Sequence, residues 1–142
     1  MADDPVVIEY TYNASIDKVW TAITDKDQMK HWYFELEEFK PIVGFEFSFK
    51  GGKDERTYLH LCKVVEVVEG SKLVYSWQYE GYVGRSLVTF KLSPEDTRTR
   101  LTLTHEGLET FPADNRDLAK ENFAAGWAYI LGTSLANFLA KT

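Results

Sequence analysis

The sequence has little of what metal and disulfide sites are made from. Cys62 is its single cysteine among 142 residues, which excludes a disulfide framework and any zinc site built on several thiolates. His31, His60 and His105 are its only histidines, and neither His-x-x-x-His nor Cys-x-x-Cys spacing occurs. We therefore expect no bound metal and no other cofactor.

Basic residues are also scarce. The chain has 16 Lys and Arg against 22 Asp and Glu, which gives a formal net charge of −6. Binding to a phosphate backbone needs clustered Lys and Arg, so we expect no nucleic-acid partner.

Targeting and membrane segments are not expected either. The first residues lack the basic and apolar regions of a secretory signal. The stretch from Asn122 to Ala140 carries no charge and is long enough to span a bilayer. Its glycines and its Asn, Ser and Thr residues make it too polar for an isolated span, so it is interpreted as a long helix buried against protein. We expect a cytoplasmic protein.

Aromatic residues, in contrast, are abundant. Nine Phe, eight Tyr and four Trp make up 15% of the chain. The length predicts a single domain over residues 1–142, and such a chain buries roughly 68–70% of its unfolded surface. A functional hypothesis therefore has to explain why so many rings are present.

Hydrophobic periodicity predicts an α+β fold. Apolar residues alternate along about seven segments joined by short turns, which favours antiparallel strands at 6–13, 34–37, 45–49, 58–68, 73–79, 86–92 and 99–106. Ser15 is an expected N-cap for a short amphipathic helix, and Asp25 or Asp27 for a second one. Helical spacing returns from Phe123 to Phe138, and this last helix, capped by Asp114 or Asn115, should be about 35–40 Å long.

The elements need each other for burial. One face of the sheet is aromatic, and the last helix has an apolar stripe, so the helix should lie across the concave face of a curved sheet. The two short helices should fill the opening between the first strand and the others. Such an arrangement leaves room either for a solid aromatic core or for a cavity lined by rings.

Several short motifs together resemble one known family. They are Val19-Trp20, Trp32, Gly44-Phe45-Glu46-Phe47, Leu73-Val74-Tyr75-Ser76-Trp77, the stretch 99–107 and Gly126-Trp127, followed by Leu131 and Leu135. In order and spacing they resemble the SRPBCC superfamily, which includes START lipid-transfer domains and the birch-pollen-allergen group. The similar branch is the C-terminal domain of the heat-shock-protein-90 ATPase activator homologue family.

The resemblance implies a helix-grip fold: a seven-stranded curved antiparallel sheet around a long C-terminal helix, with two short helices after the first strand. It also implies a hydrophobic ligand pocket whose occupant varies between members. Tyr33 departs from the Phe that is usual in this branch, and the segment Leu61-Cys62-Lys63-Val64 lacks an expected glycine. The separate N-terminal domain that docks on the chaperone is not expected here, so the resemblance does not transfer chaperone activation.

The preferred hypothesis is a binding or carrier domain, without catalysis, for a small hydrophobic or aromatic ligand held between sheet and helix. The candidate ligand-binding residues are Trp32, Phe45, Phe47, Phe49, Tyr58, His60, Tyr75, Trp77, Phe90, His105, Phe111, Phe123, Trp127 and Leu131. Leu108 and Phe111 precede the last helix and are candidates for a mobile lid.

Two alternatives stay open at this point. A cyclase or dehydratase acting on an aromatic or polyketide-like substrate would need an acid–base pair in the cavity, for which His105, His60 and the tyrosines are available. A chaperone-associated interaction module, or a homodimer, would instead present an exposed apolar patch. Cys62 with a nearby histidine lacks an evident third group, and Glu106 lies on the strand face opposite His105, so no catalytic residue is assigned.

Overall fold

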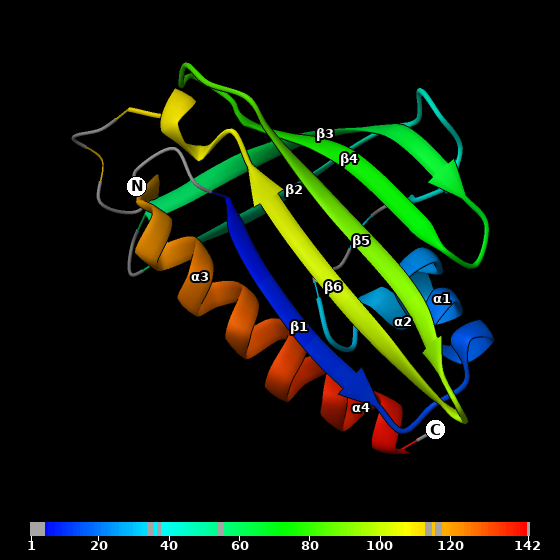
Figure 1. Ribbon diagram of the computed structural model, residues 1–142. Helices are drawn as coiled ribbons and strands as arrows, with labels where there is room; N and C mark the ends of the chain where they lie inside the picture. The colour runs from blue at the N-terminus through cyan, green and yellow to red at the C-terminus, as the bar shows by residue number, and fades with distance from the viewer. Residues whose placement is uncertain are drawn as a thin grey trace.

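The alternating segments form one antiparallel sheet that curves around a long helix (Figure 1). The structure is a computed structural model and describes residues 5–33, 36, 38–53, 56–112, 115 and 118–141. The strands pair in the order β1-β6-β5-β4-β3-β2. Their bounds are Val6–Tyr12 for β1, Glu46–Lys53 for β2, Arg56–Val68 for β3, Lys72–Tyr79 for β4, Ser86–Glu95 for β5 and Arg98–Glu106 for β6.

The described residues form six strands, one fewer than the seven expected. The missing strand was expected at 34–37, of which Phe34, Glu35 and Glu37 lie outside the described residues. Leu36 and Phe39 are described, and both are buried in the core.

The two short helices begin where their capping residues predict. Helix α1 spans Ile16–Thr24, and the side chain of its N-cap Ser15 accepts a hydrogen bond from the Lys18 amide. Helix α2 spans Lys26–Met29, and Asp25 caps it in the same manner through the Asp27 amide. In both cases a short polar side chain satisfies an amide that the first helical turn leaves unpaired.

The last helix runs from α3 (Lys120–Tyr129) through a π-helical segment, η3 (Ile130–Leu135), to α4 (Ala136–Lys141). The helix begins later than expected: its N-cap is Ala119, not Asp114 or Asn115, and the methyl side chain of Ala119 makes no capping hydrogen bond. With 22 residues and a mean hydropathy of 1.2, it is long and apolar enough to cross a membrane. In the structure it instead buries a single stripe in the protein core, formed by Phe123, Trp127, Leu131, Leu135 and Leu139.

Inward-facing side chains of the sheet complete the core. Tyr75, Phe90, Leu101, Leu103 and His105 each have at most 1% of their surface exposed. Between β6 and the last helix, residues 108–110 form a 3-10 turn, η1 (Leu108–Thr110), which follows Gly107 in the left-handed conformation at φ 86°. The turn and the start of α3 thus close one end of the grip, and α1 and α2 lie at the other (Figure 1).

Candidate functional site

Rings from five strands and from the last helix meet in the space between sheet and helix. These rings are called the aromatic cluster, and its members are Phe47, Phe49, His60, Tyr75, Trp77, Tyr79, Phe90, His105, Phe123 and Trp127. Trp127 of α3 is its centre on the helix side, with its ring centroid 5.8 Å from those of both Trp77 and Phe90. These are contact distances for aromatic pairs, so the rings touch one another across the grip.

The structure places the predicted ligand-binding residues in or beside this cluster. Thirteen of the fourteen candidates are buried, and only Phe45 is partly exposed. Phe45 precedes β2 and packs edge-on against Phe39, with centroids 6.2 Å apart. Trp32 lies after α2, and its indole N–H donates to the Ala22 carbonyl over 2.9 Å. Leu131 is fully buried in η3.

His105 is held by a directed chain of hydrogen bonds. The indole N–H of Trp127 donates to His105 Nδ1 over 3.0 Å, so Nδ1 is unprotonated. The neutral ring therefore carries its proton on Nε2, which donates to Ser86 Oγ over 2.8 Å. Ser86 donates in turn to the Trp77 carbonyl over 3.1 Å. Burial lowers the pKa of His105 to about 3, so the ring is neutral at physiological pH.

These directions decide what the Ser86 and His105 pair can do. A histidine that activates a serine must accept the hydroxyl proton. Here His105 donates to Ser86, and its other nitrogen already accepts from Trp127. The pair therefore ties the helix to the sheet and does not form an activated nucleophile.

His60 is also held neutral. Its Nδ1 lies 3.1 Å from the Tyr58 carbonyl and 3.3 Å from the Phe49 carbonyl, and since carbonyls only accept, Nδ1 carries the proton. Burial lowers the pKa of His60 to about 4, although these two bonds act in the opposite direction. Burial also raises the pKa of the nearby Cys62 thiol, which opposes formation of a reactive thiolate.

Two tyrosine hydroxyls meet inside the grip. Tyr33 Oη and Tyr75 Oη are 2.7 Å apart, and burial is the main cause that raises the pKa of both phenols. Tyr33 comes from the turn after α2, and its ring stacks on Trp127 with centroids 5.9 Å apart. The hydroxyl pair is a polar point within a wall of rings.

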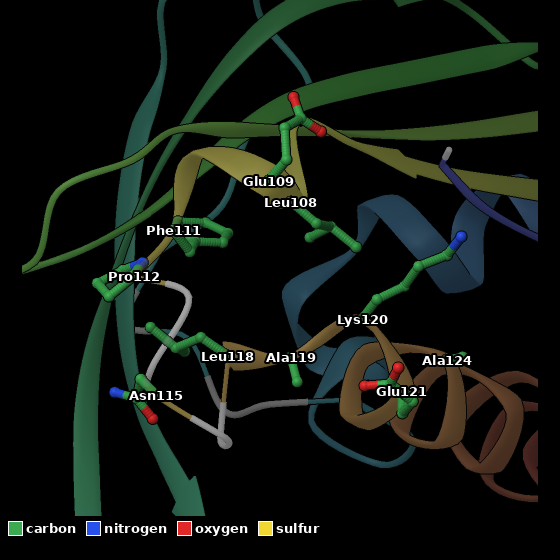
Figure 2. Close-up of a pocket in the computed structure, with 10 residues that line it drawn as sticks. All are labelled: Leu108, Glu109, Phe111, Pro112, Asn115, Leu118, Ala119, Lys120, Glu121 and Ala124. Atoms are coloured by element: carbon green, nitrogen blue, oxygen red, sulfur yellow. The ribbon is translucent and has the colours of Figure 1, made fainter. Parts of the chain in front are cut away.

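A pocket of about 640 Å³ opens beside the cluster, between η1 and the start of α3. Figure 2 shows Leu108 and Phe111 on one side of it and Leu118 and Ala119 on the other, with the carboxylate of Glu109 pointing away. The remaining lining residues are Pro112, Asn115, Lys120, Glu121 and Ala124. The ring of Phe111 stacks on Phe123 at 6.0 Å and contacts Tyr79 at 5.3 Å, so the pocket wall is also the outer layer of the aromatic cluster.

The turn that carries Phe111 is fastened to the loop between β4 and β5. The hydroxyl of Thr110 donates to the carbonyls of Gly107 and Arg85, and it accepts from the Arg85 amide over 2.9 Å. Gly84 packs so closely that a Cβ there would lie 2.6 Å from the Phe111 ring. Phe111 thus stands at the end of an anchored turn.

A metal site is not formed in the part of the chain that the structure describes, where no three His, Cys, Asp or Glu side chains lie together. Of the ten residues that line the pocket, Phe111 alone was a candidate ligand-binding residue, and Leu108 was expected only in a lid. Residue patterns also missed two polar groups of the interior, those of Ser86 and Tyr33. Ser86 lies at the start of a strand, where its pairing with His105 is set by register. Tyr33 lies in a turn, where no periodicity indicates which way a side chain points.

The curved sheet, the long helix and the two short helices after β1 define a helix-grip fold of the SRPBCC superfamily. Within it, the chain belongs to the family of activator of Hsp90 ATPase homolog 1-like proteins, whose model matches residues 13–140. The resemblance inferred from the sequence is thereby confirmed. A comparison with curated proteins found no match.

Solved structures share this fold over nearly the whole chain. MLL2253 from Mesorhizobium loti is 28% identical, with a TM-score of 0.79 over 97% of this chain and 98% of that one. CalU16 from Micromonospora echinospora is 26% identical, with a TM-score of 0.75 over 95% of this chain and 75% of that one. DynU16, from the dynemicin biosynthetic locus, is 23% identical, with a TM-score of 0.78 over 97% of this chain and 48% of that one. At this level of identity, the similarity supports a shared fold and nothing more.

Proposed function

We propose that this protein is a soluble cytoplasmic carrier that binds a small hydrophobic or aromatic ligand between the sheet and the last helix, without catalysing a reaction. The observation that carries the proposal is the pocket between η1 and α3, whose lining residue Phe111 stacks on Phe123 of the aromatic cluster. Its volume of about 640 Å³ lies within the range of roughly 300–1,000 Å³ typical of small-molecule sites.

The lining supports an apolar ligand. Leu108, Phe111, Leu118 and Ala124 supply carbon surface, and the Phe111 ring packs in turn on Phe123 and Tyr79 of the cluster. Burying apolar surface contributes about 25 cal/mol per Å², so affinity would come mainly from the part of the ligand that reaches the rings. Asn115, which donates to the Tyr58 hydroxyl over 3.4 Å, is a polar side chain of the lining that a polar group of the ligand would meet.

Binding is favoured over catalysis because the interior bases are committed. Both nitrogens of His105 are engaged in hydrogen bonds, and burial lowers the pKa values of His105 and His60 far below neutrality. General acid–base catalysis works best when the pKa of the group lies near the working pH. Neither histidine meets that condition.

The proposal is tested by asking whether a ligand occupies this pocket. Native mass spectrometry of freshly purified protein, followed by extraction, should reveal a co-purifying small molecule. NMR titration with flavonoids, sterols and fatty acids should then shift resonances of Phe111, Leu118 and Ala124. No ligand in either experiment, or shifts confined to the outer face of the sheet, would overturn the proposal.

A pair of neighbouring alanines gives a matched control. Ala124 lines the pocket and Ala125, the next residue of α3, is exposed to solvent. Ala124→Trp should fill the pocket and weaken binding at least tenfold, whereas Ala125→Trp should bind as the unmodified protein does. Equal affinities of the two variants would place the ligand elsewhere.

A cyclase or dehydratase acting on an aromatic substrate is the second candidate. It is favoured by the buried hydroxyl pair of Tyr33 and Tyr75, which can polarise a substrate carbonyl, and by the fold shared with DynU16. Mass analysis of candidate polyketide-like substrates incubated with the protein distinguishes the two functions. A carrier returns them unchanged, whereas an enzyme releases a product of altered mass or retention.

A further inference from the structure

The ring of Tyr33 occupies the space between the last helix and the sheet. It stacks on Trp127 of α3 with centroids 5.9 Å apart and planes 22° apart. It stacks also on Trp32, at 5.1 Å, and lies tilted against Phe49 of β2, at 5.9 Å. A phenol ring belonging to the chain thus fills space between the sheet and the last helix, and it is not one of the residues that line the pocket.

The hydroxyl of Tyr75 depends on this ring. Tyr75 is 1% exposed, and in the part of the chain that the structure describes its hydrogen-bond partner is Tyr33 Oη, 2.7 Å away. If Tyr33 left and an apolar group took its place, a buried hydroxyl would remain unpaired, which is costly. A replacement ring that carries its own hydroxyl would avoid that loss.

Tyr33 is also the member of this group that can move at least cost. It lies in the turn after α2 and is partly exposed, whereas Tyr75 and Phe49 are buried in paired strands. A change of side-chain rotamer at Tyr33 breaks no strand pairing. Removing Tyr75 or Phe49 from its position would disturb the sheet.

We propose that Tyr33 acts as a built-in substitute for the ligand, and that the ligand is a hydroxylated aromatic molecule which displaces the Tyr33 ring and takes over its hydrogen bond to Tyr75. The inference rests on the proposed function and specifies its ligand class. A hydroxylated ring is stacked on Trp127 and packed against Phe49 in both states, so the two states differ only in which molecule supplies it.

The test uses p-cresol, which has the shape of a tyrosine side chain, and p-xylene, which has the same shape without the hydroxyl. Calorimetric titration of Tyr33→Ala should show p-cresol bound at least tenfold more tightly than by the unmodified protein, since no ring has to be displaced. The same variant should prefer p-cresol over p-xylene by about tenfold, the effect of one buried hydrogen bond. Adding Tyr75→Phe should abolish that preference.

Tyr129→Ala is the matched control, because Tyr129 lies on the exposed side of α3, with 64% of its surface accessible. This variant should bind p-cresol no better than the unmodified protein. If Tyr33→Ala fails to fold, Tyr33→Phe keeps the ring and loses only the hydroxyl. It should then bind 2-naphthol several-fold more tightly than the unmodified protein does.

The outcomes separate the inference from the proposed function. Equal p-cresol affinity of Tyr33→Ala and the unmodified protein, or no preference for p-cresol over p-xylene, overturns the inference. The carrier function still stands if fatty acids or sterols shift the pocket resonances. Conversely, tight and hydroxyl-dependent binding by Tyr33→Ala supports the inference, and a protein that binds no member of the panel while Tyr33 is present overturns the carrier function and the inference with it.

Discussion

At position 105, the directions of three hydrogen bonds decide what a buried histidine does. A histidine within 2.8 Å of a serine has the appearance of a catalytic pair. The Trp127 indole fixes the tautomer, because an N–H can only donate, and the proton of His105 consequently points at Ser86. If the partner of Nδ1 were a carboxylate, Nδ1 would carry the proton. Nε2 could then accept the Ser86 hydroxyl proton, as the histidine of a catalytic pair does.

The chain through Ser86 leads to a prediction about stability. Ser86→Ala removes the acceptor of the His105 Nε2–H and the donor to the Trp77 carbonyl, both of which are buried. Leaving such groups unpaired costs about 1–3 kcal/mol, so the free energy of unfolding at pH 7 should fall by that amount in urea titrations. Ser48→Ala, at an exposed position of β2, is the control and should change it by less than about 0.5 kcal/mol. Similar losses in both variants would contradict the structural role of Ser86.

Single residues also mark the limit of prediction from the sequence. Alternation along the strands correctly indicated that Phe47, Phe49, Tyr75 and Trp77 share one face, because strand geometry alone decides the face. It gave no means of pairing Ser86 with His105, which depends on the register between β5 and β6. The sequence also did not show that the Tyr33 ring lies between helix and sheet, because Tyr33 is in a turn, where no periodicity predicts the direction of a side chain.

Among the elements, the π-helical segment η3 shows how closely the last helix is fitted to the first strand. The Tyr12 hydroxyl donates to the Leu131 carbonyl over 2.7 Å, and Tyr10 reaches the Ala128 carbonyl at 3.5 Å. A π-turn frees carbonyls from the regular helical pattern, so side chains from a neighbouring strand can satisfy them. Gly132 lies at this contact, where a Cβ would be 2.5 Å from Tyr10 Oη.

Two glycines of this helix should therefore respond in opposite directions to alanine. Gly126→Ala adds a methyl group with nothing within 4 Å and should raise the free energy of unfolding by about 0.5–1 kcal/mol. Gly132→Ala should lower it by about 1–2 kcal/mol, because the new methyl group collides with the Tyr10 ring. The cost of Gly132→Ala should shrink in a Tyr10→Ala background, which a double-mutant cycle measures. Stabilisation by both alanines would show that the contact with Tyr10 relaxes freely.

The helix–sheet contact concentrates at Trp127, which is 3% exposed and bonded to His105. Trp127→Ala should lower the free energy of unfolding by about 3–5 kcal/mol and lower the affinity for any ligand held between sheet and helix. Tyr129→Ala removes an exposed ring from the same helix and should do neither. Urea unfolding and ligand titration of both variants measure the two effects. Unchanged stability together with unchanged ligand binding of Trp127→Ala would contradict this placement.

Elements were predictable where a pattern was long. The caps Ser15 and Asp25, five of the strands after the first helices and the apolar stripe of the last helix all agree with expectation. The strand expected at 34–37 lies, apart from Leu36, outside the described residues. Strand β5 extends through Pro94 to Glu95, past the turn expected at 93–96, and Asp96 alone takes the left-handed conformation.

At the scale of the whole molecule, the fold keeps two titratable rings inside an aromatic core without charging them. His60 and His105 come from different strands, and both face the concave side of the sheet. Their carbonyl, hydroxyl and indole partners satisfy the neutral rings, and no opposite charge is among the hydrogen-bond partners described. Both rings are buried inside the curved sheet, so protonating either histidine would place an unpaired charge in the core.

The stability of the molecule should consequently fall on mild acidification. The unfolded chain binds protons at the usual histidine pKa of about 6.5, whereas burial lowers the folded pKa values to about 4 for His60 and about 3 for His105. The unfolded state therefore takes up more protons below pH 6.5, and the stability that is full above this pH is lost progressively down to the folded values. Each histidine should lower the free energy of unfolding by about 2 kcal/mol between pH 7 and pH 5, measured by urea unfolding across that range.

His105→Gln should reduce this pH dependence by about half. His31→Gln, at an exposed position, should leave the loss due to the two buried rings in place. An unfolding free energy that is constant from pH 7 to pH 5 would mean that the two rings are not held neutral by burial.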